Sequence, residues 1–374
     1  MHRYSTFLTL SLLFFLSCKH PSLEHLEQGD AAFRDGKFEE ADGFLNAAIE
    51  ANPHAPEAYF LLMQTKMELK DYPATIDAGN TCLDFRYQPQ RVHEVLAIAY
   101  NQLGDRERAF EHIEKTLNFD SRNAKKLVVA ANYAYALKDW NKALSYFQLA
   151  EKLGAKGNGL YHQKGACSHQ LKNWSQALIS FQKVKEGYAQ MNDVFILMAD
   201  CYLELKNLKK ANDFLLKVQE FGDQSKEAMQ LSLRIYTKQK EYKKAIEITE
   251  NYNTKFELNA EVLAIQAHLY ATVNELGKAE KALKKLNAVQ GSNFEILRSI
   301  AQVRFKQKKY SKETLDYYNR ALALKQNQAF LLRERGVVKK ELDQIESACE
   351  DWTTAAQNGD TFSQNLIASY CLSN

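Results

Sequence analysis

A small residue that returns every 34 positions is the feature of this sequence that most limits its fold. The positions are Ala41, Thr75, Ala109, Ala143, Ala177, Ala211, Ala245 and Ala279, followed after one extra residue by Thr314 and then by Ala348. Eight of these ten residues are alanine and two are threonine. A fixed period over the whole chain indicates an internal repeat rather than an effect of composition. We interpret the small side chain as the place where two helices cross too closely for a larger one.

The stretch from Asp139 to Ala150 shows what one repeat contains. Trp140, Ala143, Phe147 and Ala150 fall on one face of a helix, and Asp139 is suited to cap its first turn. A second helix is predicted upstream of each alanine, with a small residue twelve positions before it: Gly29, Ala97, Ala131, Gly165, Ala199, Ala267 and Gly336. Tyrosine stands nine positions before the alanine in four repeats, as Tyr100, Tyr202, Tyr236 and Tyr270.

This pattern resembles the tetratricopeptide-repeat family over residues 22–362, in ten repeats. The resemblance implies an all-α fold, a right-handed superhelical solenoid of about ten helix pairs. Residues 363–374 are predicted to form a capping helix over the last open core, which solenoids require. The chain departs from the family at the proline that ends the second helix, because Pro53 is its only match.

The N-terminal residues predict export. Arg3 is basic and an apolar run of ten residues follows at 7–16, which is typical of a signal peptide and too short to span a bilayer as a helix. We therefore expect residues 1–17 to be a signal peptide that is removed, with 18–21 as a short tether.

Residues 15–18 resemble the lipobox of bacterial lipoproteins, although Phe15 replaces the usual leucine. The resemblance implies that Cys18 is acylated, and palmitate is the expected kind of fatty acid. Lys19 after the cysteine resembles outer-membrane sorting, so we expect a lipid-anchored protein of the cell envelope, in the outer membrane and facing the periplasm. The alternative is an ordinary secretory signal with an incidental cysteine.

Composition and motifs favour a non-catalytic protein without a cofactor. A net charge of +3 in 374 residues does not suggest a nucleic-acid binder, which usually has a strongly basic face. The sequence contains no GxSxG, no HExxH and no phosphate-binding glycine loop. His162, Cys167 and His169 are the nearest approach to a cluster, but Cys167 points away from the helical face of the two histidines. We expect no metal there.

The family resemblance implies a concave groove lined by residues of each first helix. The corresponding residues here are Phe60, Ile98, Asn132, Tyr135, His162, His169, Asp200, Arg234, His268, Arg298, Phe305 and Arg333. Such a groove takes an extended peptide or a helix. The carboxylate clamp of chaperone-tail-binding relatives is not carried over, because Val128 and Gln163 stand where Lys and Asn are needed.

Cys349 and Cys371 are a candidate disulfide. Cys349 lies in the second helix of the tenth repeat and Cys371 in the capping helix, at nearly equal distances from the turn near Gly359-Asp360. In an antiparallel pair these positions lie at similar heights. Two buried, unpaired thiols are the alternative.

The most favoured function is a protein–protein interaction scaffold, held by its lipid in the bacterial cell envelope, that binds peptide or protein partners in the groove. We expect no nucleic-acid partner, and the sequence does not specify the oligomeric state. One alternative is an RNA-binding helical-repeat protein, against which the export signal counts. Another is an envelope enzyme adaptor with a weak catalytic role.

Overall fold

The structure is a computed structural model that describes residues 21–371, so the predicted signal peptide and Cys18 lie outside it. The described chain is all-α and forms ten helix pairs followed by one last helix. The pairs are α1 (Pro21–Arg34) and α2 (Phe38–Ala51), α3 (Pro56–Glu68) and α4 (Tyr72–Asp84), α5 (Pro89–Gln102) and α6 (Arg106–Leu117), α7 (Ala124–Ala136) and α8 (Trp140–Lys152), α9 (Asn158–Gln170) and α10 (Trp174–Phe181), α11 (Met191–Glu204) and α12 (Leu208–Glu220), α13 (Lys226–Lys238) and α14 (Tyr242–Lys255), α15 (Ala260–Thr272) and α16 (Leu276–Gln290), α17 (Phe294–Lys306) and α18 (Lys312–Leu324), and α19 (Ala329–Glu341) and α20 (Ile345–Gln357).

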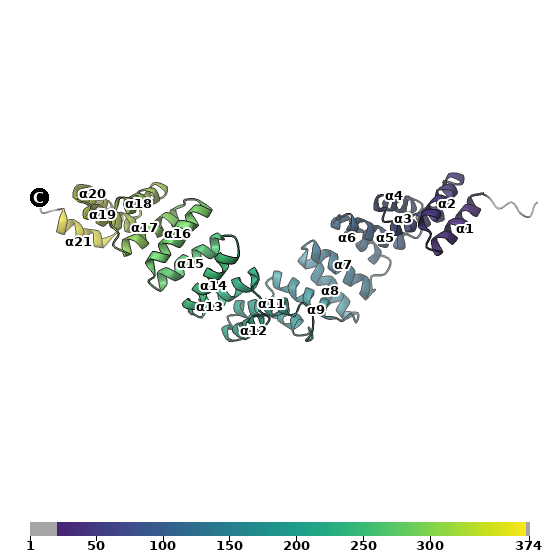
Figure 1. Cartoon of the computed structure of the whole chain (residues 1–374), viewed down its shortest axis with the longest axis horizontal. Helices are drawn as coiled ribbons and strands as arrows, with labels where there is room; N and C mark the ends of the chain where they lie inside the picture. The colour runs from purple at the N-terminus through teal and green to yellow at the C-terminus, as the bar shows by residue number, and fades with distance from the viewer. Residues whose placement is uncertain (1–20, 372–374) are drawn as a thin grey trace, which may run out of the picture. The chain divides into compact units, whose positions relative to one another are not determined.

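The chain divides into two compact units, and the division lies within α11, between Leu197 and Met198. Inside each unit the helices follow one another in chain order, and from α1 to α10 and from α12 to α21 each packs on its neighbours in the sequence (Figure 1). Odd-numbered helices also contact each other: α1 with α3, α3 with α5, α7 with α9 and α17 with α19. We therefore assign the odd-numbered helices of each unit to one layer. The right-handed superhelix stays a prediction.

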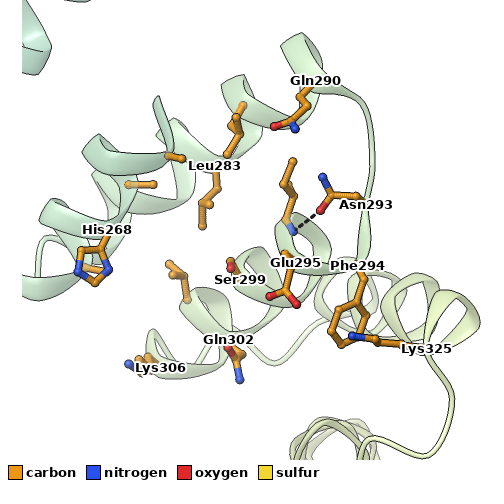
Figure 2. A pocket seen from close by; sticks show the side chains of 16 residues that line it. His268, Leu283, Gln290, Asn293, Phe294, Glu295, Ser299, Gln302, Lys306 and Lys325 are labelled. Atoms are coloured by element: carbon orange, nitrogen blue, oxygen red, sulfur yellow. Dashed lines mark hydrogen bonds between the residues drawn. The ribbon is translucent and has the colours of Figure 1, made fainter. Parts of the chain in front are cut away.

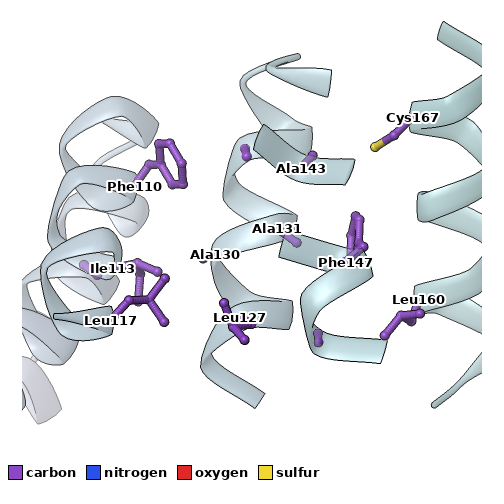
Figure 3. Packing of buried hydrophobic residues seen from close by; sticks show 13 residues of the cluster. Phe110, Ile113, Leu117, Leu127, Ala130, Ala131, Ala143, Phe147, Leu160 and Cys167 are labelled. Carbon is purple, nitrogen blue, oxygen red and sulfur yellow. The ribbon is translucent and has the colours of Figure 1, made fainter. Parts of the chain in front are cut away.

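The ten small residues of the repeat are all buried with no exposed surface. The small residues on the first helices, twelve positions earlier, are glycine in some repeats because a larger residue would clash there. A Cβ atom on Gly165 would lie 2.4 Å from the Phe181 ring, and one on Gly336 would lie 2.4 Å from Trp352. Where the first helix carries Ala131 instead, it packs in a core with Ala143 and Phe147, shown in Figure 3. The helix crossings predicted from the sequence are confirmed.

The turn within each repeat has a left-handed residue five positions before the small residue in nine of the ten repeats. Lys138 has φ of 61°, and the amide of the next residue, Asp139, donates to the carbonyl of Ala134 at 2.9 Å. This is the six-to-one bond that ends many helices. Asp139 then accepts from the amide of Lys142 and caps α8, as predicted.

The last helix, α21 (Thr361–Tyr370), begins two residues before its predicted start. Asp360 causes the earlier start, because its carboxylate accepts from the amide of Ser363 at 3.0 Å and caps the first turn. The helix packs on α20, where Trp352 is fully buried. Cys349 and Cys371 are joined here by a disulfide, with Cα atoms 5.9 Å apart.

Candidate binding face

The candidate groove residues all lie on odd-numbered helices, so they belong to the layer that these helices form. We call the exposed side of this layer the odd-helix face. Ile98 of α5, Asn132 of α7 and His268 of α15 are exposed there. Phe60 of α3 is different: it is only 7% exposed and packs in the core, with its ring 5.7 Å from that of Tyr87. The prediction that Phe60 lines an open groove is wrong, because the neighbouring repeat covers it.

Three candidate residues pack against the start of the following helix. Tyr135 lies edge-on to Trp140 with ring centroids 5.3 Å apart, and His169 does the same with Trp174 at 5.1 Å. Phe305 and Tyr310 form the corresponding contact in repeat nine at 5.6 Å. These side chains are half-buried, so each offers a partner only part of its surface.

His162 of α9 is half-buried and tied to the loop that follows α10. Its Nδ1 atom lies 3.2 Å from Oε1 of Gln190 and 3.4 Å from the hydroxyl of Tyr188. Burial lowers the pKa of His162, and the bond to Gln190 acts in the opposite direction. The ring is held in place by neutral partners.

The cationic candidates differ in how far the chain neutralises them. Arg234 of α13 pairs with Asp200, the equivalent position one repeat earlier, and with Glu204. Arg333 of α19 pairs with Asp360 at 2.7 Å. Positions 34 residues apart therefore meet across neighbouring repeats, as the Asp200–Arg234 pair shows.

The last candidate, Arg298 of α17, pairs with Glu295 at 2.5 Å on its own helix. Glu295 is one turn before Arg298, so both charges stay on one exposed stretch of α17. The three candidate arginines, Arg234, Arg298 and Arg333, are thus all paired with carboxylates of the same chain.

A pocket on the odd-helix face lies between α15, α16 and α17 and has a volume of about 670 Å³. We call it the α15–α17 pocket. It is lined by Ala264, Ala267, His268, Ala271, Leu283, Leu286, Gln290, Asn293, Phe294, Glu295, Ile296, Ser299, Gln302, Val303, Lys306 and Lys325. In Figure 2, His268 and Lys306 lie at one end of the pocket and Phe294 with Lys325 at the other.

A second pocket, of about 480 Å³, includes Arg234 with Leu233, Thr237 and Leu203. The sequence had indicated only His268 and Arg234 in these two pockets. Ser299, Gln302 and Lys306 were missed, although their spacing along α17 places them on one helical face. The missing signal is the depth of the pocket, which depends on the alanines of the neighbouring α15.

Within residues 21–371 the structure has no group of three or more His, Cys, Asp and Glu side chains placed to hold a metal ion. None of the described helices combines the length and the apolar character needed to cross a membrane.

The ten helix pairs, with a small buried residue at each crossing, define an all-α helical-repeat protein. No model of a known protein family matches the chain. A segment of 131 residues is 24% identical to the BBSome complex member BBS4 of Bos taurus. This match covers 35% of the chain and 25% of the bovine protein, so it spans about a quarter of that relative's length.

Several solved structures are similar to the chain in their helical repeats. PilF of Pseudomonas aeruginosa is 19% identical with a TM-score of 0.40, over 66% of this chain and 97% of that one. PilW, described as a widely conserved type IV pilus biogenesis factor, is 19% identical with a TM-score of 0.46, over 58% and 98% of the two chains. A tetratricopeptide repeat protein of Parabacteroides merdae is 14% identical with a TM-score of 0.37, over 75% and 98%.

Proposed function

We propose that the protein is a non-catalytic interaction scaffold that binds peptide or protein partners on its odd-helix face. The observation that carries the proposal is the position of the two pockets described above, both of which open among the odd-numbered helices. Even-numbered helices complete the linings, with Leu283 and Leu286 of α16 in the first pocket and Leu208 of α12 in the second. The odd-helix face thus offers both exposed side chains and hollows, which is what a peptide-binding surface needs.

We further propose that the scaffold is anchored in the bacterial cell envelope by a lipid on Cys18. The apolar run at 7–16 and the cysteine that follows it support this anchor. More than one acyl chain holds a protein firmly, since a single chain gives only marginal binding. Metabolic fatty-acid labelling tests it: label is expected on the native protein and none on Cys18→Ser. Equal labelling of both proteins would refute the anchor.

Site-specific photocrosslinking tests the binding face. A photoreactive residue at Asn132 of α7 is expected to give adducts with partner proteins in cells that carry the native chain. The matched control is Gln148 of α8, which is also exposed but lies on an even-numbered helix. Adducts from Gln148 alone would place the binding surface elsewhere. Adducts with RNA instead of protein would favour an RNA-binding repeat.

A further inference from the structure

We propose that the α15–α17 pocket takes a bulky apolar side chain from an extended partner segment whose flanking residues are acidic. This inference rests on the proposed function, because it names the chemistry of one partner of the odd-helix face. It follows from three properties of the pocket: its apolar interior, its free positive charge and the neutralisation of the other cations on the same face.

The interior of the pocket suits an apolar side chain. Leu283 and Leu286 of α16 and Val303 of α17 line it, and all three are buried apart from the surface that they present to the pocket. From α15 come alanines, of which Ala264 and Ala267 are two. Small side chains on one wall leave the space that larger ones would fill. Mostly apolar hollows of a few hundred Å³ with a few polar groups are typical ligand sites.

The charge at the two ends of the pocket is positive. Lys306 is exposed, and the carboxylate within its electrostatic reach, Glu334, is buried and already accepts from the hydroxyl of Tyr318. Lys325 lies over the Phe294 ring, 4.8 Å from its centroid. The one carboxylate of the lining, Glu295, already pairs with Arg298. Repeat nine, residues 294–328, has 8 Lys and Arg against 3 Asp and Glu, a net charge of +5. A partner that approaches the pocket therefore meets uncompensated positive charge.

Other cations of the odd-helix face do not offer a partner such positive charge. Arg234, in the second pocket, is neutralised by Asp200 and Glu204, and Arg333 by Asp360. An acidic segment gains favourable pairing at Lys306 and Lys325, but at Arg234 it meets carboxylates of the same charge. Complementary charge selects partners and speeds their association. The apolar interior and the two lysines together specify an apolar residue flanked by aspartate or glutamate side chains.

The test is a selection of random peptides, displayed with a blocked C-terminus, on the full chain. We expect the selected peptides to carry acidic residues around one bulky apolar residue, and to bind more weakly as salt is raised. The double variant Lys306→Glu with Lys325→Glu should lower their affinity by roughly tenfold or more. The matched control, Lys308→Glu with Lys312→Glu, changes the charge of the same repeat equally but does not line the pocket, and it should bind normally.

A second pair of variants tests the apolar part. Ala264→Phe fills the pocket from an exposed position and should abolish binding of the selected peptides, whereas Ala323→Phe on α18 should not. Circular dichroism shows whether each variant is folded.

The outcomes separate this inference from the proposed function. Neutral or basic peptides, or peptides that bind the pocket variants as well as the native chain, overturn the inference. If such peptides are lost on Asn132→Trp, the odd-helix face remains the binding surface. If no peptide is enriched, the inference fails, and this result also removes support for peptide binding on the odd-helix face.

Discussion

Repeats eight and nine carry different residues at one equivalent position, near the end of the first helix and beside the turn. In repeat eight Tyr270 is buried there, and Lys278 of the second helix lies over its ring, 5.3 Å from the centroid. Repeats three, six and seven have the same pair of a tyrosine and a cation, with Tyr100, Tyr202 and Tyr236. In repeat nine Arg304 occupies this place, and Glu313 stands where the cation was.

Arg304 is 6% exposed and its partners explain the exchange. Its guanidinium donates to Glu280 at 2.5 Å, to the hydroxyl of Thr314 at 2.9 Å and to that of Ser311 at 3.1 Å. Repeat nine is also the one with an extra residue before its small residue, Thr314. The longer turn brings hydroxyl groups into the core, and a guanidinium with its five donors can satisfy them. Tyr270, over a regular turn, has a single polar group to satisfy, and its hydroxyl donates to Glu250.

The comparison teaches that a repeat tolerates an insertion when polar groups replace the apolar contact. Such a network contributes little net stability, because burying its charges is costly, but breaking it leaves a charge unpaired. The tyrosine and cation pair contributes about 0.5–1 kcal/mol, and its loss leaves no buried charge without a partner. The two solutions should therefore respond differently to substitution, salt and acid.

Arg304→Met gives the largest expected effect. Glu280, which is 6% exposed, keeps Lys284 and Lys309, but Glu280, Thr314 and Ser311 all lose the donor that Arg304 supplies. At about 1–3 kcal/mol for each buried group left without its bond, the free energy of unfolding should fall by roughly 3–5 kcal/mol. The matched substitution in a regular repeat, Tyr202→Phe, should cost less than about 1 kcal/mol. Urea denaturation of both variants measures the difference. Equal losses would mean that the two repeats are stabilised alike.

The disulfide beside repeat ten should hold the cap on the array. Cys371→Ser is expected to lower the stability of α21 by about 3 kcal/mol, since Cys349 and Cys371 are 22 residues apart. Hydrogen exchange of α21 measures this, with reduced native protein as the reference. Thiol counting on denatured, unreduced protein should find Cys82, Cys167 and Cys201 free. If Cys349 and Cys371 also react, the pairing is wrong.

Acid should weaken repeat three before repeat nine. Repeat three contains a buried histidine pair, with Nδ1 of His93 2.9 Å from Nδ1 of His112. Burial, and then the neighbouring His93, lowers the pKa of His112 from 6.5 to about 4. The unfolded chain binds this proton more readily, so stability falls as the pH drops from 6.5 towards 4, by about 2 kcal/mol at pH 5. Tyr100, Arg108, Glu111 and Lys115 surround the pair.

Repeat nine responds at lower pH. Burial acts to raise the pKa of Glu280, but hydrogen bonds from Lys309, Lys284 and Arg304 outweigh it and lower the pKa to about 2. Its stabilising contribution is therefore present above pH 4.5 and is lost as the pH falls through about 2. Hydrogen exchange at pH 7 and pH 5 should show faster opening of α5 and α6 but not of α17. Equal acceleration of α17 would contradict this order.

A regular crossing should resist enlargement. Ala177 of repeat five has no exposed surface, and Ala177→Leu should overpack the contact between α9 and α10 at a cost of roughly 1–3 kcal/mol. Ile179→Leu on the exposed side of α10 is the control. An unchanged melting curve for Ala177→Leu would show that the repeat phase has been assigned wrongly.

The smallest expected effect concerns the turns. Lys138 has a positive φ, which glycine adopts without strain, so Lys138→Gly should change stability by less than about 1 kcal/mol, in the stabilising direction. The reverse change, Gly104→Lys in a turn with φ of 82°, should destabilise by a similar amount. Thermal melts of both variants test the pair. If both changes have the same sign, the left-handed residue does not control these turns.

The sequence by itself determined the repeat. One period brings Ala143, Ala177 and the other small residues to every crossing, and caps such as Asp139 fix where the second helices begin. These features depend on residues close in the chain, and ten repeats multiply a signal that one alone would carry weakly. The last helix begins at Thr361 for the same local reason, a cap at Asp360 that the sequence reading passed over.

The tertiary structure decided which side chains are available. Phe60 and Ile98 occupy the same layer, yet the neighbouring repeat buries the first and leaves the second exposed. Arg234 and Lys306 are both cations, but Arg234 forms ion pairs with two carboxylates, whereas the carboxylate nearest in effect to Lys306, Glu334, is buried against Tyr318. Pairing and pocket depth depend on side chains about one repeat apart in the chain. A period fixes where those residues lie but not how far their side chains extend.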